Sequence, residues 1–149
     1  MATVSVRYIV DDIDDAIGFY TGHLGFAVQM RPNDRFAMLS HGDLRLVLSV
    51  PGGSGSPGGS GSPGGSGGSG GGGQAMPDGT LPQPGGWNRF ALEVPDLAAT
   101  VAQLRKDGVR FRNDVVTGVG GKQIIAEDPS GNPVELFEPL IPEARLSRS

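Results

Sequence analysis

The stretch from residue 126 to residue 139, AEDPSGNPVELFEP, contains the carboxylate that is best placed for chemistry. Its turn at 128–132 combines a proline that fixes φ, a glycine that tolerates positive φ, and polar side chains that hydrogen-bond locally. After the turn, Val134 and Leu136 alternate with Glu135, the period of two expected of a β-strand. Glu135 is therefore expected to face away from the apolar positions, where a carboxylate could ligate a metal ion or act as a general base.

The elements that must position this carboxylate occur twice along the chain. Asp12 and Asp96 are suitable N-caps, and apolar residues follow each of them at helical spacing. The helices are expected to end near Gly25 and Gly108, since glycine readily adopts the left-handed conformation that ends a helix. The expected strands are 3–10, 26–31, 35–41 and 43–50 in the first copy, and 88–94, 109–114, 121–127 and 132–138 in the second. The sequence thus predicts an α+β fold of two βαβββ modules.

A low-complexity segment separates the two copies. Residues 51–73 contain only Pro, Gly and Ser, written as repeats of PGGSGS, and such a composition cannot bury apolar surface. The turn-rich residues that follow include Met76 and Leu81, which could pack onto a module. Whether this segment is a passive connector or a lid stays open. We expect a first module at 1–50, a linker and turn segment at 51–86, a second module at 87–139, and a tail at 140–149.

Several short motifs carry a family resemblance. They are VDDI at 10–13 and VPDL at 94–97, FY at 19–20 with LGF at 24–26, and EDP at 127–129 with ELFEP at 135–139. In these motifs the chain resembles the vicinal oxygen chelate superfamily, which includes glyoxalases, bleomycin resistance proteins and extradiol dioxygenases. The resemblance implies a glyoxalase/bleomycin-resistance-like fold in which the two modules form an incompletely closed barrel. It also implies a site on the concave sheet surface, and a homodimer for a chain of this length.

The resemblance further implies where a metal ion would bind, on the first and last strand of each module. The corresponding positions in this chain are Ser5, Val47, Arg89 and Glu135. Arginine stays protonated and valine has no donor atom, so one carboxylate and one hydroxyl remain, too few for a divalent ion. His23 is expected at a helix end and His41 in a hairpin turn, so neither repairs the set. We expect no metal site and no cofactor.

The same strand alternation predicts what the concave face offers a ligand. It places three arginines on that face and leaves the opposite face almost wholly apolar, as packing beneath helices requires. Arg89 and Glu135 are expected to form an ion pair. The candidate ligand contacts are Arg7, Met38, Arg45, Val47, Trp87, Arg89, Glu135 and Phe137. Either Arg7 or Arg45 orients an anionic or carbonyl-bearing ligand, or the charged side chains line a dimer interface or a solvated rim.

Composition excludes several classes of protein. The formal net charge of −4 argues against general nucleic-acid binding, which normally requires a basic surface. No apolar run approaches the roughly 18 residues of a membrane span, and the start of the chain does not read as a signal peptide. Cysteine is absent, which is compatible with a reducing compartment. We expect a cytoplasmic protein with neither nucleic-acid nor membrane partners.

These observations favour binding over catalysis. The leading hypothesis is a metal-independent protein that binds a small organic ligand, anionic or aromatic, as drug-sequestering antibiotic resistance proteins of the bleomycin-resistance type do. The alternative is a glyoxalase-like lyase, isomerase or dioxygenase with an atypical or metal-free site, in which Glu135 would be the candidate catalytic base. A carboxylate paired with an arginine is a poor base, which weakens this alternative. A structural dimer without a ligand is the third possibility.

Overall fold

A computed structural model describes residues 3–52 and 73–145. Residues 1–85 and 86–149 form two compact units, and each is described by itself. Most of the Pro/Gly/Ser segment, residues 53–72, lies outside the described residues, so whether it acts as a connector or a lid stays an expectation.

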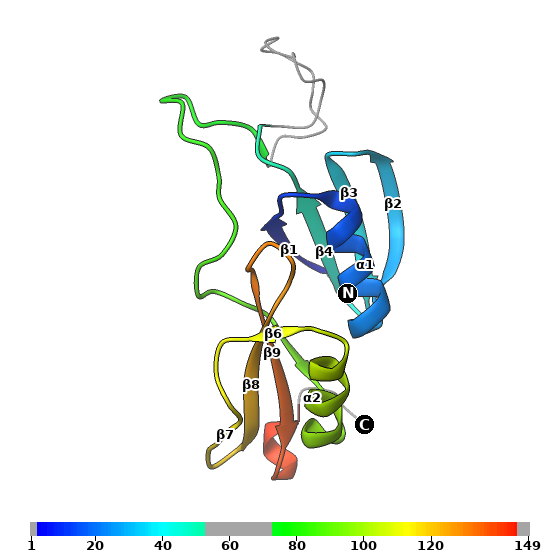
Figure 1. The fold of residues 1–149 in the computed structure, drawn as a ribbon, viewed down its shortest axis with the longest axis vertical. Coiled ribbons are helices and arrows are strands. Elements are labelled where there is room, and N and C mark those ends of the chain that lie inside the picture. The colour runs from blue at the N-terminus through cyan, green and yellow to red at the C-terminus, as the bar shows by residue number, and fades with distance from the viewer. Residues whose placement is uncertain (1–2, 53–72, 146–149) are drawn as a thin grey trace. The chain divides into compact units, whose positions relative to one another are not determined.

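In its described residues the first unit contains one four-stranded sheet and one α-helix (Figure 1). Its elements are β1 (Val4–Ile9), α1 (Ile13–Leu24), β2 (Ala27–Asn33), β3 (Phe36–His41) and β4 (Leu44–Ser49). The strand order is β1-β4-β3-β2, with β1 parallel to β4 and the other pairs antiparallel. A parallel pair needs a crossover connection, and here α1 and the β2–β3 hairpin form that connection.

The second unit repeats this plan around a sheet ordered β5-β9-β8-β6, with β5 parallel to β9. Its elements are β5 (Ala91–Glu93), α2 (Leu97–Lys106), β6 (Arg110–Phe111), β7 (Val116–Thr117), β8 (Gly121–Glu127), β9 (Pro133–Pro139) and the short 3₁₀ helix η3 (Pro142–Ala144). The chain therefore has an α+β fold of two βαβββ-like modules, as predicted.

Local sequence signals set both ends of the helices. Asp12 Oδ1 accepts a hydrogen bond from the Asp15 N–H at 2.9 Å, and Asp96 Oδ1 accepts one from the Ala99 N–H at 3.0 Å. Gly25 follows α1 with φ of 78°, in the left-handed region that favours glycine. The sequence did not predict a further cap on α2. The Glu138 carboxylate accepts from the Leu97 N–H at 2.8 Å, tying β9 to the first turn of the helix.

The core of each unit lies between its helix and one face of its sheet. In the first unit α1 buries Ile13, Phe19 and Tyr20, and the sheet buries Leu46 and Leu48. In the second unit α2 buries Leu97, Val101 and Leu104, and the sheet buries Ile124, Val134 and Leu136. Each such side chain contributes about 1.5–3 kcal/mol by leaving water. The sheet positions agree with the predicted strand alternation.

Two expectations about local structure are wrong. Of the strand expected at 109–114 only β6 is formed, and a break separates it from β7, which lies beyond residue 114 and also pairs with β8. The break occurs because the Asn113 side chain, rather than a backbone carbonyl, accepts from the Ile125 N–H at 2.9 Å. Met76 and Leu81 do not pack down, since they are 49% and 47% exposed. Among the described residues, no helix is both long enough and apolar enough to span a bilayer.

Candidate functional site

The helix-free face of the first sheet carries one of the predicted sets of ligand contacts. The register places Arg7 on β1 beside Val47 on β4, and Val47 beside Met38 on β3. Register partners share a face, so these three side chains form one row across the sheet. Met30 on β2 pairs with Met38 and extends the row. Sequence reasoning missed Met30 because the β2–β3 register contains irregularities on both sides of it.

Arg7 is the cation of this row. Its Nη1 donates to Ser49 Oγ at 2.8 Å, and Ser49 is only 2% exposed. None of the carboxylates that the structure describes pairs with Arg7, so its remaining N–H groups are available to an acceptor. Ser49 was not among the predicted contacts, although it shares the predicted face. A guanidinium held by one buried hydroxyl is well suited to a carboxylate or another oxyanion.

Arg45 shares the face but points elsewhere. Its Nη1 donates to the carbonyl oxygens of Gly42 at 2.9 Å and Leu44 at 3.2 Å, at the β3–β4 turn. The Arg7 guanidinium instead donates to the Ser49 hydroxyl, at the opposite end of β4. The two arginines therefore do not converge, and Arg7 is the better candidate for ligand binding.

The predicted ion pair is present on the second sheet. Arg89 Nη2 lies 3.0 Å and Arg89 Nε 3.1 Å from the same Glu135 oxygen, Oε1. The two side chains are 27% and 17% exposed. Arg89 Nη1 also donates to the Trp87 carbonyl at 3.1 Å. The register puts Glu135 beside Ala91 on β5, so no second charge from β5 lies next to it in that row.

This pair should couple measurably in a double-mutant cycle. We expect Arg89→Ala and Glu135→Ala to show a coupling energy of about 1 kcal/mol, the upper end of the range for surface pairs, because both side chains are mostly buried. Urea unfolding followed by circular dichroism would measure it. The Arg105–Asp114 pair is the matched control, because its atoms lie 3.4 Å apart and its side chains are 51% and 97% exposed. Equal coupling energies in the two pairs would contradict the inference that burial makes the Arg89–Glu135 pair the stronger one.

The most extensive polar network in the second unit involves residues that sequence reasoning missed. Arg112 Nε donates to Glu127 Oε2 at 2.9 Å, and the Arg112 guanidinium carbon lies 4.6 Å from the centroid of the Trp87 ring. Trp87 itself was predicted and is 69% exposed. Alternation from the inward-facing Phe111 would have placed Arg112 on the helix-free face. The contact with Glu127 was not readable from one strand alone, because it depends on the β6–β8 register, which pairs Arg110 with Glu127.

Phe137 sits in a neighbouring row of the same sheet. Its register partners are Glu93 on β5 and Gln123 on β8. A Cβ placed at Gly121 would lie 2.9 Å from the Phe137 ring, so the glycine allows the ring to lie close to the β8 backbone. Phe137 is half-buried, which leaves part of the ring accessible to a ligand.

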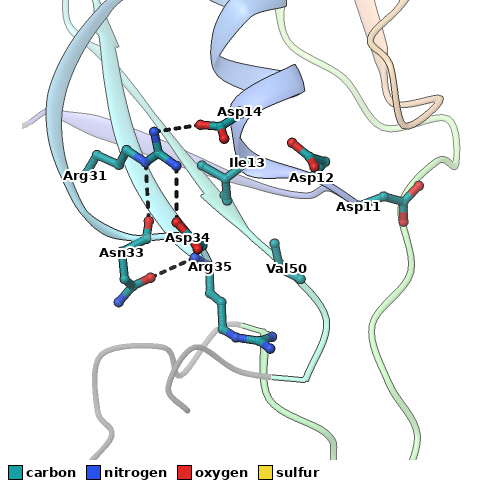
Figure 2. A pocket seen from close by; sticks show the side chains of 9 residues that line it. All are labelled: Asp11, Asp12, Ile13, Asp14, Arg31, Asn33, Asp34, Arg35 and Val50. Atoms are coloured by element: carbon teal, nitrogen blue, oxygen red, sulfur yellow. Dashed lines mark hydrogen bonds and ion pairs between the residues drawn. The ribbon is translucent and has the colours of Figure 1, made fainter. Parts of the chain in front are cut away.

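A cavity of about 470 Å³ lies elsewhere in the first unit, between the N-terminus of α1 and the β2–β3 hairpin (Figure 2). Arg31 bridges its walls, with Nη1 2.6 Å from Asp14 Oδ1 and Nη2 3.5 Å from Asp34 Oδ1. None of the predicted ligand contacts lines it. The cavity is therefore separate from the predicted binding face.

Comparison with known proteins identifies the family. The model of the Glyoxalase/Bleomycin resistance protein/Dioxygenase superfamily matches residues 3–136, most of the chain. The chain belongs to this superfamily. The resemblance inferred from the sequence motifs is thereby confirmed, together with a glyoxalase-like fold. No curated protein matches the chain.

Solved structures support the same fold. A superfamily member from Sphaerobacter thermophilus DSM 20745 is 24% identical with a TM-score of 0.64, covering 93% of this chain and 97% of that one. TnmS3, an antibiotic binding protein from Streptomyces sp. CB03234, is 22% identical with a TM-score of 0.61, covering 93% and 96%. Lactoylglutathione lyase from Agrobacterium tumefaciens is 18% identical with a TM-score of 0.61, covering 92% of each chain. At these identities the likenesses show the fold alone.

The donor atoms of this superfamily member do not fit a divalent ion of the usual kind. Two of the four positions that the family resemblance implies for a metal, Ser5 and Val47, lie on the first sheet and offer one hydroxyl between them. At the other two, the Glu135 carboxylate is bonded to the Arg89 guanidinium. Among residues 3–52 and 73–145, no three His, Cys, Asp or Glu side chains are grouped so that they could hold a metal. His23 and His41 instead make ring contacts with Phe19 and Phe26, with centroids 5.5 and 4.9 Å apart.

Proposed function

We propose that this superfamily member is a metal-independent small-molecule-binding protein that sequesters a drug or metabolite. The observation that carries the proposal is the Arg89–Glu135 ion pair, because it engages the one carboxylate at the four family metal positions. A cation would have to displace a guanidinium at 3.0 Å and would find no second strong donor there. Binding without a metal uses the other side chains on the helix-free face of each sheet.

The ligand contacts that we propose combine apolar surface with a few directing charges, as small-molecule sites generally do. Arg7 would direct an anionic or carbonyl group, with Val47 and Met38 as apolar neighbours in its row. On the second sheet Trp87 and Phe137 would supply aromatic surface. An antibiotic binding protein of the same fold makes drug sequestration, and with it antibiotic resistance, a reasonable role. A homodimer in the cytoplasm is part of the same proposal.

An enzymatic role finds less support. Glu135 is the candidate base, and a base must be free to take a proton from its substrate. Two nitrogens of Arg89 bond to Oε1 of this carboxylate, so Oε1 is engaged and only Oε2 could take a proton from a substrate. The chain shares its fold with a lactoylglutathione lyase, but at 18% identity that likeness shows the fold alone.

The proposal predicts ligand binding that survives chelation. In calorimetric titrations with a panel of antibiotics, including carboxylate-bearing aromatic ones, at least one should bind with an affinity that EDTA leaves unchanged. Arg7→Ala should weaken the carboxylate-bearing ligands about tenfold, the effect of losing a charge-assisted hydrogen bond. Arg45→Ala is the matched control on the same face, expected to change affinity less than about twofold because Arg45 is bonded to the turn.

Two outcomes would contradict the proposed function. The first is that no member of the panel binds. The second is turnover of the methylglyoxal–glutathione hemithioacetal or of a catechol that appears on adding nickel, zinc or iron and disappears with a chelator, since that would require a working metal site.

A further inference from the structure

Trp87 presents one ring face that the described protein already occupies and one that it does not. The guanidinium carbon of Arg112 lies 4.6 Å from the indole centroid. The residue as a whole is nevertheless 69% exposed, an unusual state for the largest apolar side chain in the sequence. A large aromatic ring held from one side and open on the other is a stacking surface.

Arg112 is held more firmly than an ordinary surface arginine. Its Nε donates to Glu127 at 2.9 Å, Nη1 to the Gly86 carbonyl at 2.6 Å, and Nη2 to the Gly131 carbonyl at 2.8 Å. Its side chain is only 15% exposed. All three guanidinium nitrogens therefore have acceptors, and the plane that supports the indole has a defined orientation.

The backbone around the tryptophan is held by the same kind of contact. Arg112 binds the carbonyl of Gly86, directly before Trp87, and Arg89 Nη1 binds the carbonyl of Trp87 itself at 3.1 Å. Two arginines from different parts of the second unit thus hold the peptide that carries the ring. A contact surface ordered before its ligand arrives loses less entropy on binding.

The electrostatics of this arrangement select among aromatic ligands. A cation on one face of an indole polarises its π electrons toward that face, so the open face becomes a better partner for electron-rich or negatively charged rings. The charge in contact with the ring is the positive Arg112 guanidinium, which also favours an anion on the open face.

We infer that the open face of Trp87 is a stacking subsite for planar, electron-rich aromatic ligands that carry a negative charge, such as hydroxylated aromatic carboxylates, and that Arg112 is its positioning residue. This inference rests on the proposed small-molecule-binding function and assigns that function a ligand class. Cationic aromatic rings should be disfavoured at the same place, because Arg112 repels them through the ring.

The test uses the full chain and a pair of probes, 6-hydroxy-2-naphthoate and the N-methylquinolinium cation. Trp87 is the only tryptophan, so the single indole N–H signal in a ¹⁵N-correlated NMR spectrum reports stacking on this ring. We expect the naphthoate to shift this signal upfield with an affinity about tenfold above that of the quinolinium. Arg112→Ala should weaken naphthoate binding about tenfold and abolish the preference.

Two variants control for a merely structural effect. Arg105→Ala removes another arginine stacked on a ring of this unit, at 5.2 Å from the Phe111 centroid, and should leave both affinities unchanged within about twofold. Arg112→Lys keeps the charge but not the planar fork, so a folded Arg112→Lys protein should retain the preference for the anion with naphthoate binding weakened about threefold. This variant decides the question if Arg112→Ala unfolds.

The outcomes separate the two proposals. Equal affinity for both probes, or a preference that survives in a folded Arg112→Ala protein, would overturn the stacking subsite. Naphthoate binding that Arg112→Lys leaves unchanged would also overturn it. Calorimetric binding of naphthoate without any shift of the indole signal would also overturn it, while leaving the proposed function intact. If no member of the antibiotic panel binds the wild-type protein, the proposed function itself fails.

Discussion

Gly121→Ala is expected to lower the free energy of unfolding of the second unit by about 3 kcal/mol, the upper part of the range for overpacking a core. A Cβ at this position would overlap the Glu138 carbonyl oxygen and would lie 2.9–3.0 Å from two atoms of the Phe137 ring. The carbonyl belongs to the neighbouring strand β9, so only a shift of the β8–β9 ladder could relieve the clash. Urea unfolding followed by Trp87 fluorescence, which reports on this unit, would measure the loss.

The turn between β7 and β8, which ends at Gly121, offers a matched control. At Gly118 a new Cβ would have its nearest neighbour, the Gly121 carbonyl oxygen, at 4.0 Å, an ordinary contact. Gly118→Ala should therefore leave the urea midpoint almost unchanged. A Gly121→Ala protein as stable as the Gly118→Ala protein would show that β8 and β9 separate easily, contrary to the structure. A ligand that contacts Phe137 should also bind more weakly to Gly121→Ala.

Asp128→Ala is expected to destabilise the second unit by a similar amount, roughly 3 kcal/mol, since it leaves buried donors without acceptors. Asp128 is fully buried in the β8–β9 turn. Its Oδ1 accepts from the Ser130 and Asn132 N–H groups, both at 2.9 Å, and its Oδ2 accepts from Asn132 Nδ2 at 3.0 Å. Asn132 is itself 3% exposed, so water would not readily replace the lost carboxylate.

Asp114→Ala serves as the control for this second substitution. Asp114 lies in the same unit, but its side chain is 97% exposed and makes one long ion pair to Arg105 at 3.4 Å. Removing it should leave the urea midpoint unchanged within error. If Asp128→Ala behaved like Asp114→Ala, the turn would not depend on the buried carboxylate, and the hydrogen bonds described above would contribute little.

The modules and their helices could be predicted because their signals are local. An aspartate before an apolar helical pattern bonds to N–H groups three residues away, and this holds for Asp12 and Asp96. Strand alternation likewise needs only neighbouring residues, and the buried face of Leu46 and Leu48 followed from it. The Arg89–Glu135 pair was predictable because a repeated module implies which strands are neighbours.

The remaining features depend on which side chains meet across strands. Arg45 lies on the predicted face, yet its guanidinium bonds to the Gly42 carbonyl, a choice among acceptors that strand periodicity does not specify. The strand expected at 109–114 ended early because the Asn113 amide competed with the backbone for the Ile125 N–H. Such competitions depend on which acceptors the fold brings within hydrogen-bonding distance of each donor.

Sequence by itself thus determined the duplicated βαβββ plan and the apolar face of each sheet. These follow from side-chain chemistry and short-range periodicity. Only the tertiary structure decided that Arg112, Glu127 and Trp87 form one network, because the register of β6 on β8 and the return of the chain at Gly86 bring them together. A side chain's type limits the bonds that it can make, and the fold selects the partner.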